Sequence, residues 1–548
     1  MIFYCDFETT SEEQYNLEGL TRVYLWCALN NENDNVKYGV DIDSFIKYLI
    51  SFNESCTAYF HNLSGFDGHF IIYYILKNKL KYDIIMDEFK KIYNIKLFVT
   101  DDIIISFKCS YLLIMDSIEK LGEMIGVKKL NETHNYDEIK NYNDLKDVPQ
   151  EELDYIYNDT LILKQVMLSI FPKDPVKLTM SSIAYKEWYS MNYWLKIKGL
   201  LEPVTDDVIK KDIDMSYYGG ICQLNKKYSG QLLHNVYAYD INSMYTYAMY
   251  DKPMPCGQPK EYDTIEECKK NHDLFLVKIH IDKVEILDGF IPFIPTKGTS
   301  YFNQSYDYDR IIEDKIIVLW EDMFELFEKY YHGVYVIIKC IGFKSVNRIF
   351  NKYLDKYIEM KENAKDKITR KKAKNYMNML YGKFGMNEER ISKNLDFDFE
   401  NEEIIYKNVI KQLPQHRKDI ASRITSNAKI LLINAIENNA DKFVYCDTDS
   451  IYTIGKGKDL PIDDVKIGYW KLEGIFDFKG LKAKCYIRAN EEKFEPKISG
   501  LPKDLSNMIT FDNFKFGLKL EKVKKRKKIV KGGVIISKTD FSIKLTKN

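Results

Sequence analysis

Acidic residues close several strand-like segments that lie far apart in the chain, and this pattern constrains the fold more than any other feature. Asp6 and Glu8 lie in the opening apolar segment, Asp240 follows a run of alternating aromatic residues, and Asp447 and Asp449 lie between two apolar runs. A single acid at a strand end is usually a solvated edge or part of an ordinary turn. The ordered set instead indicates a fold that gathers carboxylates from distant segments.

The size and composition indicate a folded chain of several domains. At about 150 residues per domain, the 548 residues give roughly three or four domains. Hydrophobic residues make up 45% of the chain, which excludes a long disordered protein. No run reaches the roughly 18 apolar residues of a membrane helix, and the start lacks the pattern of a secretory signal. Ten cysteines without a Cys-x-x-Cys pair favour reduced thiols in a cytoplasmic compartment over a zinc ribbon or disulfide framework.

The charge is unevenly distributed. Residues 479–548 carry 19 Lys and Arg against 7 Asp and Glu, a surplus of 12 positive charges, although the whole chain has a formal net charge of −1. The densest basic run is Lys522-Val-Lys-Lys-Arg-Lys-Lys528. A basic C-terminal part suits a polyanionic partner, because neutralised phosphates release counterions. Such a run is also compatible with a merely solvated face.

Periodicity predicts the main elements around the acids. The first 170 residues alternate strands and helices, which indicates an α/β domain. We expect strands at 2–8, 57–60 and 236–239, a β-hairpin at 443–452, and helices at 67–79, 149–163 and 351–383, the last as one long helix or a helical pair. The last 70 residues are predicted to form short strands with basic turns.

The N-terminal acids form a candidate metal site. Asp6 and Glu8 share one face of a strand, because side chains alternate. Asp67 lies in a strand-to-helix loop, and Tyr155 and Asp159 are one helical turn apart. Four such carboxylates suit two Mg²⁺ or Mn²⁺ ions about 3.5–4 Å apart, an arrangement that activates water for phosphodiester cleavage. Tyr155 would orient that water.

A second candidate site lies in the middle of the chain. Lys374, Asn378 and Tyr381 share one stripe of a predicted helix. A cation, an amide and an aromatic ring suit a triphosphate, a sugar and a base. The carboxylates of Asp240, Asp447 and Asp449 would hold two divalent ions, and Lys374 would neutralise charge on a leaving pyrophosphate. The pattern indicates phosphoryl transfer.

Taken in order, the motifs resemble those of family B DNA polymerases, and in particular the protein-primed branch from small tailed bacteriophages (the phi-twenty-nine type). The N-terminal acids resemble its 3′–5′ proofreading exonuclease. Asp240-Ile-Asn-Ser-Met-Tyr245, Lys374 to Gly382, and Tyr445 to Ser450 resemble polymerisation motifs A, B and C. The resemblance implies a multidomain α/β and α+β fold: an RNase H-like exonuclease domain followed by a right-hand polymerase of palm, fingers and thumb with two insertions.

The resemblance also implies domain boundaries. We expect the exonuclease domain at 1–180, the start of the palm at 181–250, an insertion for a terminal protein at 251–345, the fingers at 346–384, a second insertion for processivity and strand displacement at 385–418, the rest of the palm at 419–478 and the thumb at 479–548. From Asp240 to Lys374 there are 134 residues, and from Tyr381 to Asp447 there are 66. Both spacings leave room for the insertions.

Roles in the polymerase site follow from the same resemblance. Asp240, Asp449 and the Ile241 carbonyl would bind metal with Asp447 close by, and Tyr245 would exclude ribonucleotides. The incoming nucleotide would contact Lys361, Arg370 or Lys371, Lys374, Asn378 and Tyr381. Primer and template would contact Tyr217, Gly219, Gly220, Thr425, Lys429, Lys484 and Tyr486. Lys429 stands where the family usually has arginine.

In the exonuclease site, the resemblance implies metal binding by Asp6, Glu8, Asp67 and Asp159. Frayed single strands would contact Tyr59, His61, Asn62, Phe70 and Ser117, which fits the stacking of bases on aromatic rings. The catalytic lysine of the family has no clean match, and Lys128 and Lys129 are both candidates. An extra residue, Gly65, leaves the geometry between Asn62 and Asp67 open.

The implied partners are a DNA template and primer, dNTPs, two Mg²⁺ or Mn²⁺ ions in each site, a single-strand DNA-binding protein and a separate terminal protein that serves as primer. We expect a monomer, or a heterodimer with terminal protein, in the cytoplasm of a host cell. Because Asp6 lies so close to the start, the terminal protein is expected to be a separate gene product. The alternatives are a polymerase that uses ordinary nucleic-acid primers, a catalytically inactive DNA-binding scaffold, and a nuclease alone.

Overall fold

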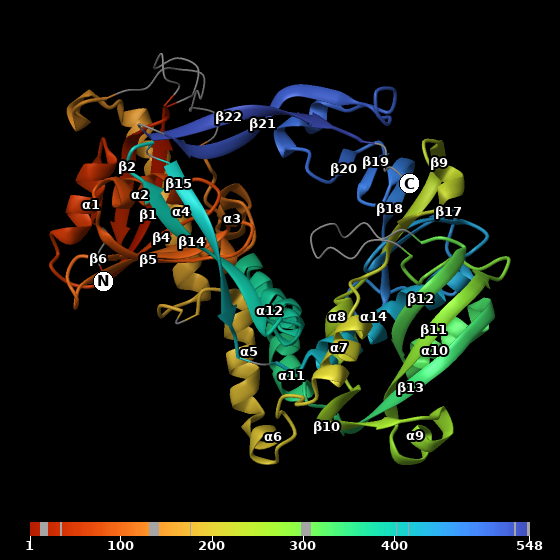
Figure 1. Cartoon of the computed structure of the whole chain (residues 1–548). Helices are drawn as coiled ribbons and strands as arrows, with labels where there is room; N and C mark the ends of the chain where they lie inside the picture. Colours follow the sequence, from red (N-terminus) through yellow and green to blue (C-terminus); the bar gives the residue numbers. More distant parts are fainter. Residues whose placement is uncertain are drawn as a thin grey trace.

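The computed structural model describes residues 1–10, 20–32, 35–130, 142–175, 177–296, 308–401, 403–414, 416–530 and 533–544 (Figure 1). Within these ranges, no helix is long and apolar enough to cross a membrane. The segment Gly532-Gly-Val also resembles part of a polymerase thumb, and its first residue lies outside the described residues.

The N-terminal domain is built on a seven-stranded sheet with the order β3-β2-β1-β4-β7-β6-β5. Its strands are β1 (Ile2–Thr9), β2 (Val23–Asn30), β3 (Val36–Gly39), β4 (Cys56–Phe60), β5 (Lys81–Met86), β6 (Ile92–Phe98) and β7 (Ile104–Cys109). Its main helices are α1 (Ile42–Ile50), α2 (Gly68–Lys77), α3 (Ile118–Ile125) and α4 (Gln150–Ile170). β2 is buried at every position, as expected for a continuous apolar strand covered on both faces. The predicted α/β domain is confirmed.

A second seven-stranded sheet, which we call the palm sheet, has the order β20-β19-β18-β9-β17-β16-β8. Its strands are β8 (Cys222–Leu224), β9 (Leu232–Ile241), β16 (Phe443–Asp447), β17 (Ser450–Ile454), β18 (Trp470–Lys482), β19 (Cys485–Ala489) and β20 (Phe494–Ile498). The predicted hairpin at 443–452 is confirmed. The expected domain boundary at 479 falls inside β18, and strand pairing continues to β20, so the palm sheet extends beyond that boundary.

Helices connect the two large sheets. They are α5 (Met180–Met191), α6 (Tyr193–Ile197), α7 (Asp207–Ser216), α8 (Met244–Met249), α11 (Asn351–Glu362), α12 (Lys367–Met379), α13 (Tyr381–Phe384) and α14 (Lys418–Asn438). The predicted helical segment 351–383 is a helical pair with a short third turn. α12 packs against α5 and α11, and also against α3 and α4 of the N-terminal domain. It therefore lies between the N-terminal domain and the palm (Figure 1).

Two segments form sheets of their own between parts of the palm. The first is a four-stranded sheet of β10 (Pro253–Tyr262), β13 (Tyr331–Asn347), β11 (Leu274–Ile286) and β12 (Ile311–Trp320) in that order, with α9 (Ile265–Asn271) and α10 (Glu321–Tyr330). The second is a hairpin of β14 (Glu389–Asp398) and β15 (Glu403–Gln412). These sheets lie in the segments where the two insertions are expected.

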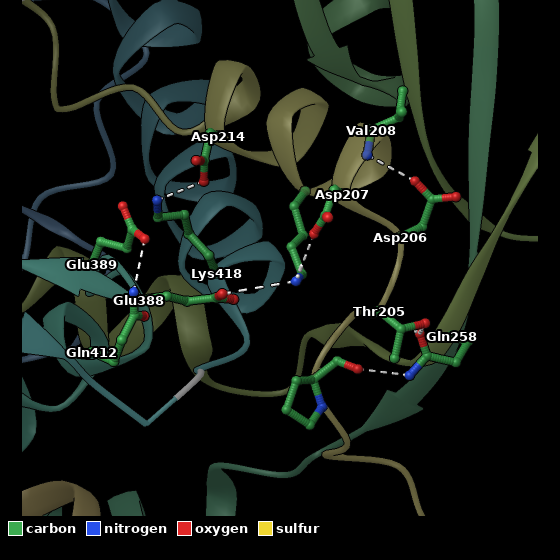
Figure 2. A network of polar contacts seen from close by, with 12 residues as sticks. Thr205, Asp206, Asp207, Val208, Asp214, Gln258, Glu388, Glu389, Gln412 and Lys418 are labelled. Carbon is green, nitrogen blue, oxygen red and sulfur yellow. Dashed lines mark hydrogen bonds and ion pairs between the residues drawn. The ribbon is translucent and has the colours of Figure 1, made fainter.

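Helix α7 ties the bases of both inserted segments to the palm (Figure 2). Lys210 on α7 lies 3.8 Å from Glu388, just before β14, and Asp214 pairs with Lys418 of α14 at 2.5 Å. In the loop before α7, the amide of Thr205 donates to the side chain of Gln258 on β10 at 3.1 Å. Helix α7 and the loop before it thus contact both inserted segments and helix α14 of the palm.

The last two strands, β21 (Lys519–Val530) and β22 (Gly533–Ser542), form a long ribbon that reaches the N-terminal domain (Figure 1). The amide of Thr21 donates to the carbonyl of Val534 at 2.7 Å. The basic run 522–528 lies within β21 rather than in a turn, because β21 pairs with β22 along a strand longer than the short strands that were predicted.

Candidate active sites

The backbone positions of Asp240, Asp447 and Asp449 lie near one another at the tip of the β16–β17 hairpin. In the palm sheet, Asp240 is the register partner of Ser450, and Ser450 is in turn the partner of Asp447. The amide of Ile241 donates to the carbonyl oxygen of Asp449 at 2.8 Å. The sheet thus brings together acids that are far apart in sequence.

The segment from Tyr217 to Gly220, which contains three expected primer ligands, lies directly against this tip. Thr448 adopts a φ of 59°, and its amide donates to the Ile221 carbonyl at 2.8 Å. A Cβ added to Gly220 would lie 2.7 Å from the Thr448 hydroxyl oxygen, whereas one on Gly219 would meet no atom within 4 Å. Glycine at 220 therefore permits a close approach of backbone to side chain. The Tyr217 ring packs over Gly385.

The carboxylates at the tip strengthen one another's affinity for protons. Burial raises the pKa of Asp240 to about 7, with further contributions from Asp449 and Glu473. Burial also raises the pKa of Asp449, and Asp447 adds to the rise. The ammonium of Lys374 opposes both shifts, so α12 delivers a cation to the same place. Concentrated negative charge in a partly buried site favours binding of cations.

Several expected nucleotide ligands cluster close to these carboxylates. The rings of Tyr245 and Tyr381 stack, with centroids 4.1 Å apart and planes at 6°. Lys361 donates to the Ser243 hydroxyl at 3.4 Å. Burial lowers the pKa of Lys361, and the charges of Arg370 and Lys374 lower it further, so three cations gather there. Asn378 is half-buried one turn after Lys374.

Lys371 faces a different direction. Its ammonium forms an ion pair with Asp116 of the N-terminal domain. Of the two alternatives predicted for the triphosphate, Arg370 therefore faces the cation cluster and Lys371 does not. The reason is helical geometry, because consecutive residues point about 100° apart around the axis.

The expected primer ligands are divided between surface and interior. Lys484 reaches Asp447 at 3.5 Å, at the hairpin tip. The Lys429 ammonium lies 5.2 Å from the Tyr218 ring centroid, and burial lowers its pKa to about 7. Thr425 and Tyr486 are buried instead. The Tyr486 hydroxyl bonds to that of Tyr452 at 3.0 Å, so this ring packs inside the sheet.

A second group of carboxylates lies in the N-terminal domain. Asp6 and Glu8 lie on β1, Asp67 precedes α2, and Tyr155 and Asp159 lie on α4. Burial raises the pKa of Asp6 well above its usual range, and Asp67, Glu8 and Asp159 add to the rise. Burial likewise raises the pKa of Glu8 to about 8, with Asp159 the next cause. The four acids thus share one buried region, as the sequence predicts.

Lys129 is the lysine that contacts this group of acids. Its ammonium pairs with Asp159 at 2.7 Å and lies 5.5 Å from the Tyr155 ring centroid. The Lys128 carbonyl instead accepts a hydrogen bond from Asn158 at 3.2 Å. The structure therefore distinguishes two lysines that the sequence leaves as alternatives.

With both groups of acids located, the chain can be compared with known proteins. The family model described as DNA polymerase type B, organellar and viral, matches residues 125–464. The chain belongs to this family. It is a DNA-directed DNA polymerase, and the expected enzyme class is confirmed.

Two relatives cover nearly the whole polymerase. The DNA polymerase of Bacillus phage M2 is 28% identical over 99% of both chains, and that of Streptococcus phage Cp-1 is 28% identical over 99% of this chain and 98% of the other. A structure titled Phi29 DNA polymerase complexed with primer-template DNA and incoming nucleotide substrates has a TM-score of 0.87 at 25% identity, covering 99% and 100% of the chains. The expected multidomain fold and the resemblance to the phage branch are confirmed.

The expected single-strand ligands of the polymerase differ in accessibility. Tyr59 is 1% exposed and donates its hydroxyl to Asp174 at 2.5 Å, and Phe70 is also buried. Neither ring is open for stacking on a base, since both complete the core around the sheet. Asn62 and Ser117 are exposed.

His61 is intermediate in exposure between the buried and the exposed ligands. Its ring nitrogens are 3.0 Å from the Ser110 hydroxyl and 2.8 Å from the Asp116 carbonyl. Burial lowers its pKa to about 4, and the charge of Lys129 contributes to the lowering. His61 therefore lies within electrostatic reach of Lys129, the lysine that pairs with Asp159.

The donor chemistry of both acid groups fits divalent metal ions. Among the described residues, no three His, Cys, Asp or Glu side chains converge into a ready-made metal cage. Asp159 Oδ1 is nevertheless buried without a hydrogen-bond partner in the described part of the polymerase. A cation shared by the acids would relieve both this cost and the mutual repulsion that raises their pKa values. All-oxygen donor sets suit Mg²⁺ or Mn²⁺.

Sequence reasoning missed Glu473. It lies on β18 and raises the pKa of Asp240 and of Asp449. β18 is the register neighbour of β9, and this pairing alone brings Glu473 to the site. Its local sequence contains no signal, because pairing between distant strands is not encoded in short motifs.

Proposed function

We propose that the polymerase extends DNA at the palm site, proofreads 3′ ends in the N-terminal domain and starts from a separate terminal protein. The observation that carries this proposal is the register of β9 with β17, which joins Asp240 to the acids of the hairpin tip. The cations Lys361, Arg370 and Lys374 face the same place. Carboxylates opposed to cations are the arrangement that nucleotidyl transfer from a triphosphate needs.

At the palm site, Asp240, Asp449 and the Ile241 carbonyl would hold two Mg²⁺ or Mn²⁺ ions. Such ions would lower the pKa of the attacking hydroxyl and neutralise charge on the leaving pyrophosphate. The lysines and Arg370 bind the triphosphate. The Tyr245 ring, held flat by Tyr381, blocks the position of a ribose 2′-hydroxyl. Base pairing supplies the sequence information, so the protein contacts backbone and shape.

In the N-terminal domain, Asp6, Glu8, Asp67 and Asp159 would hold the ions that cleave a 3′ phosphodiester. Lys129 pairs with Asp159 and opposes the rise in the pKa of Asp159 that burial causes, and Tyr155 orients the attacking water. Exposed Asn62 and Ser117 contact the frayed strand. A mismatched end frays more readily than a paired one, which selects it for removal.

Separating the two reactions tests this assignment. Asp449→Ala should abolish primer extension while 3′–5′ degradation of single strands continues, and Asp6→Ala should do the converse. Both activities are measured on labelled oligonucleotides with Mg²⁺ and then with Mn²⁺. If either substitution removes both activities while the variant's unfolding transition matches that of the parent, the two-site assignment is wrong.

Protein priming is supported by the extra sheet β10-β13-β11-β12 in the segment where a terminal-protein insertion is expected, and by full-length similarity to small phage polymerases. The deciding assay is attachment of one labelled dNMP to a hydroxyl of a candidate terminal protein encoded next to the polymerase gene. A single-strand DNA-binding protein would then assist elongation. If the polymerase extends oligonucleotide primers but never labels such a protein, the alternative of ordinary nucleic-acid priming replaces this proposal.

A further inference from the structure

Helix α12 carries residues that face two different sites. Arg370 and Lys374 contribute to the positive charge around Lys361, and Lys374 also acts on Asp240 and Asp449. Lys371, between them, points to the N-terminal domain. One rigid helix therefore bears on both the proposed nucleotide site and the proposed exonuclease site.

The contact on the N-terminal side is specific. Lys371 pairs with Asp116, and the side chains are only 21% and 16% exposed. The carbonyl of Asp116 bonds to His61 at 2.8 Å, and the next residue, Ser117, caps α3. α12 packs along α3 and α4 as well. The ion pair thus joins α12 to the loop that holds two expected single-strand ligands.

A short linker precedes the helix, so that it could shift as a unit. α11 ends at Glu362, and α12 begins only at Lys367, with the side chain of Asp366 capping its first turn. Three clustered cations repel one another, and a bound triphosphate would draw Arg370 and Lys374 toward the palm carboxylates. Because the helix is rigid, the same displacement carries Lys371 away from Asp116.

We propose that the Lys371–Asp116 ion pair is a positioning contact that holds α12 against the N-terminal domain in the absence of nucleotide and is given up when a nucleotide binds. The free energy of the ion pair then opposes nucleotide binding. A nucleotide that binds only when α12 has moved binds more weakly if a contact stabilises the unmoved helix. It also biases the polymerase toward removal of the 3′ end when dNTP is scarce. This inference rests on the proposed nucleotide site.

The test uses the full-length chain with Asp6→Ala, so that degradation does not interfere. The apparent Kd of the correct dNTP is measured by single-turnover extension for Lys371→Met, Asp116→Asn, the double variant and the charge reversal Lys371→Glu with Asp116→Lys. We expect each single variant to bind dNTP about two- to fivefold more tightly, the range for a partly exposed ion pair. The double variant should match the singles, and the reversal should return toward the parent value. Lys367→Met, exposed on the same helix, is the matched control.

A second readout separates this role from general destabilisation. With the exonuclease intact, Lys371→Met should reduce removal and replacement of a paired primer end at low dNTP concentration. The rate on single strands should stay within about twofold, because the His61 partner is a backbone carbonyl rather than the replaced side chain. The thermal midpoint should remain near that of the parent.

Opposite results overturn the proposal. Weaker dNTP binding by Lys371→Met without an effect of Asp116→Asn would make Lys371 a triphosphate ligand. Additive effects in the double variant would show that the two side chains act independently. Lys374→Ala separates a failure of the proposed nucleotide site from a failure of the positioning contact. If Lys374→Ala leaves dNTP affinity unchanged, the proposed nucleotide site is wrong. If Lys374→Ala weakens dNTP binding but Lys371→Met does not strengthen it, only the positioning contact is refuted.

Discussion

At the scale of single residues, the palm site depends on contacts with little free space. Gly220 lies against Thr448, which separates the two acids of the hairpin tip. Thr448 adopts a left-handed backbone conformation at φ 59°, which is uncommon for a β-branched residue. A displacement at this point is transmitted directly to Asp447 and Asp449.

We expect Gly220→Ala to reduce extension by about tenfold or more, because the new methyl group displaces Thr448 and even small misplacement of reacting groups is costly. Steady-state primer extension measures the effect, and degradation of single strands should be retained. Adding Thr448→Ala, which removes the opposing hydroxyl, should restore part of the activity. If Gly219→Ala, whose methyl group meets no atom within 4 Å, is equally harmful, crowding against Thr448 is not the cause.

Lys429 should make folding stability depend on pH. Burial lowers its pKa from 10.5 to about 7, so between these values the unfolded chain binds more protons and the contribution of Lys429 to stability rises with pH. Below pH 7 its unfavourable contribution is complete. We expect Lys429→Met to be more stable than the parent at pH 7, with a difference that shrinks toward pH 10 in denaturant titrations. A constant difference would contradict the lowered pKa, and Lys367→Met provides an exposed control.

At the scale of elements, the β14–β15 hairpin is fastened at its base and along its length. Arg390 donates to Tyr93 at 2.9 Å and lies 3.4 Å from Asp87. The hydroxyl of Tyr82 donates to the Leu395 carbonyl at 3.1 Å. These contacts hold the hairpin along the edge strand β5 of the N-terminal sheet, so its position is set by a domain that is distant in sequence.

We propose that this hairpin, which lies where the second insertion is expected, helps to hold DNA. Arg390→Ala should then shorten the product made per binding event, because the hairpin would detach more often. We expect a two- to fivefold decrease, about the effect of losing an interaction worth up to about 1 kcal/mol. Primer extension with a trap that prevents rebinding gives the length. Addition of the first nucleotide should be unaffected. Lys393→Ala is the control, since Lys393 pairs with Asn408 inside the hairpin, and an equal decrease there would refute the docking argument.

At the scale of the whole molecule, contacts between distant parts close the chain into a ring. The β21–β22 ribbon packs on α2 of the N-terminal domain and on β15, and Thr21 and Val534 are bridge partners. The palm sheet and α12 complete the circuit (Figure 1). The basic run of β21 lies on this ring, which suits a partner with a charged backbone.

Closing the ring covalently should control access of DNA. Paired strand positions suit a disulfide, so Thr21→Cys with Val534→Cys should crosslink on oxidation. We expect enzyme oxidised before mixing to lose extension on a primed circular template, and enzyme oxidised after DNA binding to retain it, as measured by extension with and without reductant. The single Thr21→Cys variant should be insensitive to oxidation. Equal activity in both orders of addition would show that DNA does not pass through the ring.

The sequence by itself indicated the enzyme class through its resemblance to a known family, and local periodicity predicted the strand or helix around the acids. The tertiary structure decided what depends on distant pairing. Strand register brought Glu473 to Asp240, and packing of α3 and α4 selected Lys129 over Lys128. The direction of one helix gave Lys371 to Asp116 rather than to a nucleotide, and core packing closed Tyr59 and Phe70 to bases. A side chain's neighbours across a sheet or domain boundary follow from the global packing minimum, which no short stretch of sequence encodes.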